Sequence, residues 1–251
     1  MSGHSRWATI KRKKASIDAK RGQAFTKIIK EIIVAAKAGG GDQNTNARLR
    51  TVLEKAKATN MPQDNIKKAI QKGTGELPGV SYEEITYEGY GPGGAAMLIN
   101  VTTDNKNRTA ANLRSTLAKY NGSMASLGAT SWQFEQKGYI IVPKEAIDED
   151  KLMEIALEAG AQDIQNEENS YDITTAPQDF EKVKKALDDK HVGYSSAEVT
   201  MVPKNYIKLE GKAAEQMLNL MNALDEDEDV QNVYANFDIP QEIMDKLSRE
   251  E

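Results

Sequence analysis

The sequence contains no cysteine and only two histidines, His4 and His191. The absence of cysteine excludes disulfide bonds, thiolate nucleophiles and cysteine-ligated zinc or iron–sulfur centres. Two histidines cannot build a three-histidine zinc site within one chain, and the HExxH motif is missing. We therefore expect no metal and no other cofactor.

Long hydrophobic runs are missing as well. A helix needs about 20 apolar residues to span a bilayer, whereas the run from Ile32 to Ala36 has five. The basic N-terminus is not followed by the apolar segment that a secretory signal requires. We therefore expect a cytoplasmic protein with no membrane partner.

Charge is abundant but unevenly distributed. Residues 1–75 hold 12 lysines and 5 arginines against 5 acidic residues, a net charge of +12. Residues 76–251 hold 16 basic and 33 acidic residues, a net charge of −17. A segment with charge of one sign is typical of a surface that binds polyanions, although an ordinary solvated helical surface is the alternative.

The basic segment has the apolar spacing of helices, because apolar residues recur every three or four positions in three stretches. These stretches predict helices over residues 16–38, 45–59 and 62–72. We expect them to form a small basic three-helix domain over residues 1–80, which ends in a turn-rich linker.

The pattern changes to strands and helices after this linker. Residues 82–90 and 95–103 predict a hairpin, and a helix over residues 106–120 follows, capped by Asp104. The hairpin turn contains the string GYGPGG, which satisfies G-x-G-x-x-G. A strand follows it instead of a helix, so a turn is favoured over a dinucleotide site. We expect Trp132 and Phe134 to lie on one face of a further strand.

The rest of the chain indicates two α/β units. Residues 138–203 have the order βαββαβ, which is that of the ferredoxin-like fold. Residues 204–240 give strand, helix and strand, which would complete the unit begun by residues 81–137. We therefore predict an α+β multidomain fold, in which the ferredoxin-like domain is inserted into a discontinuous middle domain and an acidic tail (residues 241–251) follows. Three consecutive domains are the alternative.

The N-terminal arm carries the strongest local signal for function. Its cations suit phosphates, and its rings suit unstacked bases. The candidate nucleic-acid-binding residues here are His4, Arg6, Trp7, Lys11, Arg12, Lys13, Lys14, Lys20 and Arg21. Trp7 has an alternative role as an anchor to another domain, and His4 as an exposed arm residue.

Two further clusters are candidates for nucleic-acid contacts. Asn44, Asn46, Arg48 and Arg50 follow a glycine loop, and helix capping by the asparagines is the alternative to binding. The string DNKNR, residues 104–108, joins a strand to a helix. Its helix N-terminal amides, together with Arg108, suit a phosphate or a polar RNA edge.

The remaining polar features do not indicate catalysis. The run DEDED, residues 225–229, is more simply a solvated loop than a metal site. His191 follows a lysine-rich helix and is a poor catalytic candidate. The sequence therefore predicts no catalytic residue and no metal ligand.

Several long blocks carry a family resemblance. The blocks GHSRWATIK, DAKRGQAFTKIIKEI, AAKAGGGDQNTNARLR, NMPQDNIKKAIQKGTGE, YEEITYEGYGPGGAA and TDNKNRTAANLR resemble, in this order, those of the YebC/PmpR family. This family includes the mitochondrial translational activator of cytochrome oxidase subunit I. The resemblance spans residues 2–240 and implies a three-domain α/β protein. It includes His4, Ser5, Arg6, Trp7, Lys20, Arg21, Arg48, Arg50, Asn105, Asn107 and Arg108. The sequence departs from the family pattern at KRKKAS and at DQNTN.

The resemblance also implies a function. Family members are described as DNA-binding transcriptional regulators, and also as translation factors that bind ribosomal RNA and relieve stalling at proline-rich sequences. We expect a non-enzymatic, monomeric translation factor that binds ribosomal RNA at the ribosome. The alternatives are a transcriptional regulator that binds duplex DNA and an enzyme with a carboxylate site.

Overall fold

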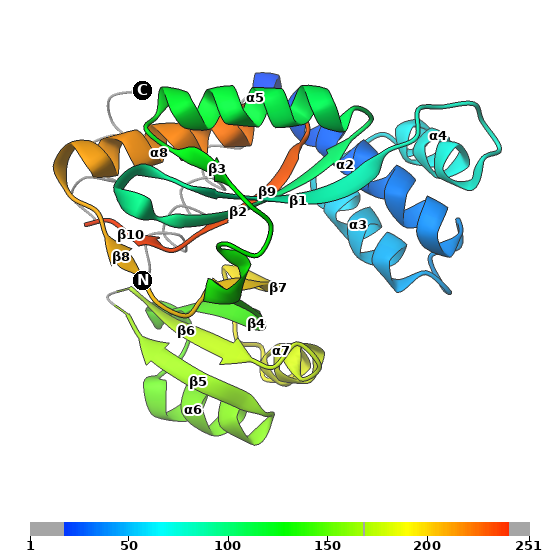
Figure 1. The fold of residues 1–251 in the computed structure, drawn as a ribbon. Helices are drawn as coiled ribbons and strands as arrows, with labels where there is room; N and C mark the ends of the chain where they lie inside the picture. The colour runs from blue at the N-terminus through cyan, green and yellow to red at the C-terminus, as the bar shows by residue number, and fades with distance from the viewer. Residues whose placement is uncertain (1–17, 168, 241–251) are drawn as a thin grey trace.

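The computed structural model describes residues 18–240 apart from residue 168, and for residues 18–21 it describes the backbone alone. Figure 1 shows three bodies: a helical body at one side, a first sheet with two helices on one face, and a second sheet below the first. Within the described residues, no helix is long and apolar enough to cross a membrane.

The helical body consists of three helices that confirm the predicted ones. They are α2 (Asp18–Gly39), α3 (Ala47–Ala58) and α4 (Gln63–Thr74). The chain leaves α2 at Gly40, which has a φ of 83° and donates its N–H to the carbonyl of Ala36. Glycine adopts this left-handed conformation without a steric penalty. The three helices share one core, in which Ile32, Leu49 and Ala56 are fully buried.

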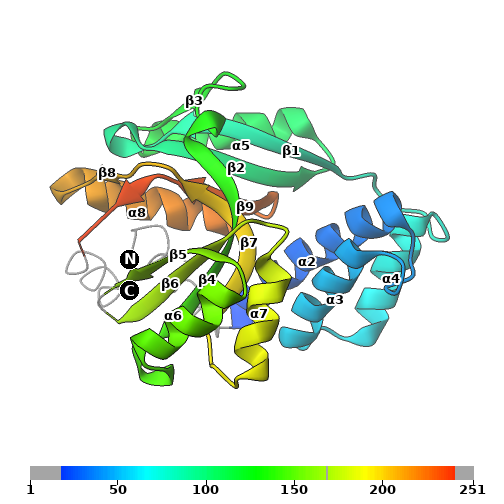
Figure 2. The same cartoon turned by 90° about the horizontal axis from the view of Figure 1, so that it is seen from below.

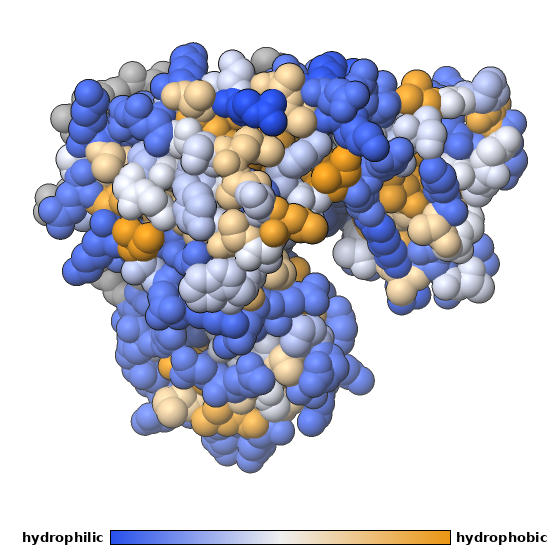
Figure 3. All heavy atoms as spheres, in the orientation of Figure 1, coloured by the Kyte–Doolittle hydropathy of each residue, from blue (hydrophilic) through white to orange (hydrophobic). Residues whose placement is uncertain are grey.

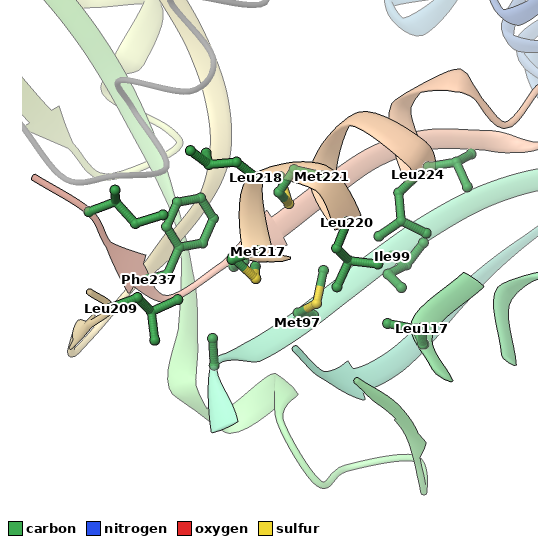
Figure 4. Packing of buried hydrophobic residues seen from close by; sticks show 14 of the residues in the cluster. Met97, Ile99, Leu117, Leu209, Met217, Leu218, Leu220, Met221, Leu224 and Phe237 are labelled. Atoms are coloured by element: carbon green, nitrogen blue, oxygen red, sulfur yellow. The ribbon is translucent and has the colours of Figure 1, made fainter. Parts of the chain in front are cut away.

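The first sheet has four antiparallel strands in the order β3-β1-β2-β9. Its strands are β1 (Glu83–Tyr90), β2 (Ala96–Thr103), β3 (Ser123–Ala125) and β9 (Val230–Ala235). The helices α5 (Lys106–Lys119) and α8 (Gly211–Glu226) cover one face. Figure 4 shows the core between sheet and helices, where Met97 and Ile99 of β2 meet Met217 and Leu220 of α8.

The turn between β1 and β2 is the glycine-rich string that also matched a dinucleotide motif. It forms the short helix η1 (Pro92–Gly94), and the N–H of Gly91 donates to the carbonyl of Ala95 at 2.7 Å. Gly93 and Gly94 have φ values of 69° and 80°. The expected hairpin is confirmed, and the glycines make its turn possible.

The second sheet has the strand order β5-β6-β4-β7, which confirms the expected ferredoxin-like order of the elements. Its strands are β4 (Phe134–Pro143), β5 (Ala161–Asn166), β6 (Ser170–Thr175) and β7 (Ser196–Pro203). The helices α6 (Glu149–Glu158) and α7 (Phe180–Asp189) lie together on one face, as Figure 2 shows. Leu152, Val183 and Leu187 are fully buried against this sheet.

The chain returns to the first sheet after the second. A parallel pair, β8 (Ile207–Lys208) and β10 (Phe237–Asp238), flanks this return, and β9 then pairs with β2. This topology agrees with a discontinuous middle domain. The domain boundaries at residues 80, 137 and 203 stay a prediction.

Two local expectations were wrong. Asp104 does not cap α5, because Asn105 is the N-cap and its side-chain oxygen accepts from the N–H of Arg108 at 3.1 Å. Trp132 is not in a strand but in the short helix η2 (Ser131–Gln133), whereas Phe134 begins β4. The turn at Trp132 arises because the N–H of Gln133 donates to the carbonyl of Thr130.

Candidate nucleic-acid interface

Most of the predicted N-terminal contacts lie outside the described residues. This holds for His4, Ser5, Arg6, Trp7, Lys11, Arg12, Lys13 and Lys14, and for the side chains of Lys20 and Arg21. The backbone of residues 18–21 forms the start of α2. The predicted residues with described side chains are those of the DNKNR cluster and of the segment after the glycine loop.

The predicted DNKNR cluster lies at the N-terminus of α5. Asn105 serves as its cap, while Lys106 and Asn107 are exposed in the first helical turn. Exposed helix N-terminal positions suit an anion, because the helix dipole and the N–H groups point toward it. The cluster thus combines a structural cap with two exposed side chains.

Arg108 has acidic partners on two sides. Its guanidinium donates to Oδ1 of Asp104 at 2.7 Å and to Oδ2 of Asp229 at 3.1 Å. The hydrogen bond to Asp104, followed by that to Asp229, raises the pKa of Arg108 above its ordinary value. The side chain of Arg108 is about half exposed, whereas the Asp229 carboxylate that it contacts is buried. Arg108 therefore reaches from the surface to a buried carboxylate.

Asp229 is the centre of this arrangement. Its carboxylate accepts from Lys30 Nζ at 2.7 Å, from Thr109 Oγ1 at 2.7 Å and from Thr103 Oγ1 at 3.3 Å. Burial alone would raise its pKa, but the hydrogen bonds from Lys30, Thr109 and Arg108 outweigh it and lower the pKa to about 2. The carboxylate is therefore ionised throughout the physiological range.

The sequence favoured a solvated loop for the acidic run, residues 225–229, but this run contacts the helical body. Lys27 of α2 donates to the carbonyl of Asp225 at 2.6 Å, and Lys30 donates to the carbonyl of Glu228 at 2.9 Å. These contacts join the helical body to the end of α8. The acidic run thus neutralises part of the basic helix and fixes its position.

The asparagines after the glycine loop have structural roles. Asn46 caps α3 by accepting from the N–H of Leu49 at 3.0 Å, and it donates to the carbonyls of Ala35 and Gly40, both at 2.8 Å. Asn44 bonds to the carboxylate of Asp42. Capping, the alternative weighed for these residues, therefore accounts for Asn46.

Arg48 and Arg50 differ in their surroundings. Arg48 makes a two-fold ion pair with Glu84 of β1, in which one hydrogen bond measures 2.9 Å. The hydrogen bond to Glu84 raises the pKa of Arg48. Arg50 is exposed and makes no ion pair with any described residue. Of these two arginines, Arg50 is the one whose charge no described carboxylate offsets.

A cleft of about 500 Å³ lies between α3 and the face of the first sheet opposite α5 and α8. Figure 3 shows that the surface is hollowed between the helical body and the body built on the second sheet. Polar side chains line most of the cleft: Glu31, Arg48, Thr51, Lys55, Glu84, Thr86, Asn100, Thr102, Gln231 and Asn232. The amide nitrogen of Gln231 is buried, with no hydrogen-bond partner among the described residues.

The outer side of the helical body presents further cations. Arg50, Lys57, Lys67, Lys68 and Lys72 are exposed on α3 and α4 and make no ion pair with any described residue. Arg50 and Lys57 lie two turns apart on one face of α3, with Glu54 between them. Lys68 and Lys72 lie one turn apart on α4. These five side chains are called the outer cations below.

Groups that could bind a metal are not assembled in the part of the chain that the structure describes. Across residues 18–240 without residue 168, no three histidine, aspartate or glutamate side chains come together as a metal site. The acidic run is instead occupied by the lysines of α2.

Comparison with known proteins gives these features a context. Residues 5–76 match the TACO1/YebC protein N-terminal domain, and residues 82–237 match the TACO1/YebC second and third domain. The chain belongs to the TACO1/YebC family. The family resemblance that the sequence blocks indicated is therefore confirmed. The match to the N-terminal domain includes the arm from residue 5 onward, which lies outside the described residues.

Members of the TACO1/YebC family resemble this chain over its full length. The probable transcriptional regulatory protein GSU1074 of Geobacter sulfurreducens is 58% identical over 98% of this chain and 100% of its own length. A probable transcriptional regulatory protein of Syntrophus aciditrophicus is 57% identical over 99% of this chain and 100% of its own. These relatives carry names of regulatory proteins.

A solved structure shares the fold. The conserved hypothetical protein Aq1575 from Aquifex aeolicus is 45% identical, with a TM-score of 0.80 over 92% of this chain and 96% of that one. The α+β fold with a helical N-terminal part is thus shared with an experimental structure.

Proposed function

We propose that this protein is a non-enzymatic translation factor of the cytoplasm, which binds ribosomal RNA as a monomer and relieves stalling at proline-rich sequences. One observation carries the proposal. Lys27, Lys30 and Arg48 of the helical body pair with acidic partners at the junctions, whereas the outer cations are exposed without such partners.

The two groups have different tasks. Lys27, Lys30 and Arg48 bond to the first sheet and the acidic run, and so position the helical body. The outer cations keep their full charge for phosphates. Each phosphate that such a side chain neutralises releases counterions, which gives binding that weakens as salt rises.

Ribosomal RNA is favoured over duplex DNA by the predicted arm. His4 and Trp7 offer rings on which unpaired bases stack, and such bases are typical of folded RNA. The polar cleft beside α3 adds amide and hydroxyl groups of the kind that bond to base edges. All bond chemistry would remain with the ribosome.

The second candidate is a transcriptional regulator that binds duplex DNA, which the names of the relatives favour. It predicts a specific affinity about 1,000-fold or more above non-specific binding. The outer cations alone would bind all duplexes alike.

Cross-linking in growing cells, followed by sequencing of the recovered RNA and DNA, tests the proposal. The test variant replaces Lys57, Lys67, Lys68 and Lys72 with alanine. The matched control replaces Lys151, Lys182, Lys185 and Lys190, which are exposed lysines of the second-sheet body, so that both variants lose the same charge.

We expect a focused ribosomal-RNA site that the test variant loses and the control keeps. Focused promoter DNA without a ribosomal site would support the transcriptional alternative. Equal recovery of ribosomal RNA by both variants would show that the outer cations are not the docking surface.

A further inference from the structure

A buried carboxylate organises the connection between the two sheets. Glu88 of β1 is 4% exposed. It accepts from the N–H groups of Gly128 at 2.7 Å, Thr130 at 2.6 Å and Ser131 at 3.0 Å. Burial opposes its ionisation, but these bonds outweigh it and lower its pKa to about 2. The connection is thus wrapped around a fixed anion.

Further bonds hold the same connection at its other side. Thr130 Oγ1 is 3.0 Å from the carbonyl oxygen of Met97, to which it donates. The carbonyl of Gln133 accepts from the N–H of Lys204 at 2.8 Å, and its side chain accepts from Asn236 at 3.1 Å. The backbone of residues 128–133 is therefore fixed to both sheets.

This fixed connection nevertheless exposes a large aromatic side chain. Trp132 is 65% exposed. Its indole N–H donates to the carbonyl of Ala129 at 3.0 Å, within the same connection. Because the polar group of the ring is already bonded, the exposed part of Trp132 is apolar ring surface. Leu127 nearby in sequence is 87% exposed.

The sequence on the N-terminal side of Trp132 is uncharged, and the Glu88 carboxylate behind the connection is buried and bonded to its backbone. No charged residue occurs from Tyr120 to Phe134, a stretch of 15 residues in a chain that is 28% charged. Small polar residues and glycines make up about half of it. A carboxylate beside the ring would repel a nucleic-acid strand. Residues 120–134 contain none, and the next carboxylate along the chain, Glu135, is paired with Lys137 and Lys204.

We propose that Trp132 is a stacking platform for one unpaired base of a bound RNA. The inference rests on the proposed function and adds a second contact outside the helical body. A base needs only one ring face, and stacking is tolerant of sequence because every base has a π-face. A protein partner would need a contiguous interface of about 1,000 Å² or more, which two isolated apolar side chains do not provide. Fixing the backbone in advance lowers the entropy cost of binding.

Tryptophan fluorescence offers a direct test, because the chain has two tryptophans, Trp7 and Trp132. In a Trp7→Phe variant, Trp132 is the sole tryptophan. Single-stranded oligoadenylate is added until binding is saturated. The fluorescence anisotropy of a labelled RNA reports the extent of binding. We expect quenching of Trp132 by this RNA and little quenching by a blunt RNA duplex, whose bases are already stacked. Absence of quenching at saturation would overturn the proposal.

Affinity measurements on the otherwise unchanged chain complete the test. Replacement of Trp132 with alanine should weaken binding of the oligoadenylate roughly 5- to 100-fold, the range for loss of one stacked base. Trp132→Phe should keep most of the affinity because it keeps a ring, and Leu127→Ala serves as the exposed apolar control. Thermal unfolding of each variant shows that it is folded.

The outcomes separate this inference from the proposed function. If the unchanged chain binds no RNA, both fail. Suppose instead that the unchanged chain binds RNA. If Trp132→Ala then binds RNA as tightly as the unchanged chain, and RNA does not quench Trp132 in the Trp7→Phe variant, only the stacking platform is overturned. Equal losses for Trp132→Phe and Leu127→Ala, again without quenching, would also overturn it and indicate an apolar protein contact.

Discussion

Lys30 Nζ lies 2.7 Å from Oδ1 of Asp229, and each side chain is only 8% exposed. The pair joins α2 to the residue that precedes β9. Taking two charges out of water is costly, and their attraction offsets this cost only when further hydrogen bonds satisfy them. Here Thr103, Thr109 and Arg108 supply those bonds to the carboxylate.

Removal of the lysine should be strongly destabilising. Lys30→Met leaves the buried carboxylate without its closest cation, which we expect to lower the free energy of unfolding by about 3 kcal/mol. Lys37→Met on the exposed side of the same helix should change it by less than about 0.5 kcal/mol. Urea unfolding followed by circular dichroism measures both. Equal effects would show that the buried pair does not hold the bodies together.

Acid should weaken the protein through two carboxylates. The pKa values of Glu88 and Asp229 are about 2 in the folded protein, against ordinary values of 4.5 and 3.8. A depressed pKa stabilises the fold fully above the ordinary value, and this stabilisation is lost as pH falls toward the folded pKa. Glu88 should contribute about 3 kcal/mol that disappears between pH 4.5 and 2, and Asp229 about 2 kcal/mol that disappears between pH 3.8 and 2. Glu88→Gln should be less stable at neutral pH and show a flatter decline in unfolding midpoint below pH 4.5. A decline identical to that of the unchanged chain would contradict this origin.

The glycine loop depends on Asn46. Its replacement with alanine removes the cap of α3 and leaves the carbonyls of Ala35 and Gly40 without their donor. We expect a loss of about 2 kcal/mol. Asn44→Ala, at an exposed position of the same loop, is the control and should lose much less. Thermal unfolding of the two variants checks this order.

Close packing of α2 against α4 requires Gly73. A Cβ atom there would lie 2.5 Å from the carbonyl oxygen of Ile33 and 2.7 Å from the Cβ of Ala36. Gly73→Ala should therefore destabilise the helical body by about 1–3 kcal/mol. Gly22→Ala is the matched control, since nothing lies within 4 Å of its Cβ position. It should stabilise α2 by about 0.5–1 kcal/mol. A loss in both variants would contradict the packing argument.

The salt dependence of RNA affinity should show which of the outer cations contacts a phosphate. Lys68→Ala should reduce the slope of log affinity against log salt by about 0.7–0.9, the effect of one phosphate contact. Lys185→Ala, an exposed lysine of α7, should leave the slope unchanged. Titrations of a structured ribosomal-RNA fragment at several salt concentrations measure both slopes.

Local patterns in the sequence were sufficient for most of the fold. The apolar stripe containing Ile28 and Ile32 predicted α2, and the pattern of residues 95–103 predicted the second strand of the hairpin, which is β2. Both patterns depend on residues close together in the chain. The order of strands and helices then indicated the ferredoxin-like unit.

Long-range partners account for what the sequence did not reveal. Asp229 looked solvated because its neighbours are acidic, and Lys30 is remote in the chain. Trp132 looked like a strand residue because Phe134 follows at a spacing of two, whereas the turn depends on bonds to Glu88. Arg48 was predicted to bind nucleic acid, and its ion pair with Glu84 depends on how α3 lies against β1. Such contacts are fixed by docking of the bodies and not by local periodicity.

The position of β9 near the C-terminal end of the sequence has a consequence during synthesis of the chain. A ribosome makes the basic α2 early, but Asp229 and β9 only after the whole second sheet. During most of its synthesis, the nascent chain therefore carries an uncompensated basic helix beside a first sheet that lacks its last strand. Chains that stop before residue 229 leave Lys30 without its carboxylate, and β2 takes the place of β9 as the edge strand of the first sheet.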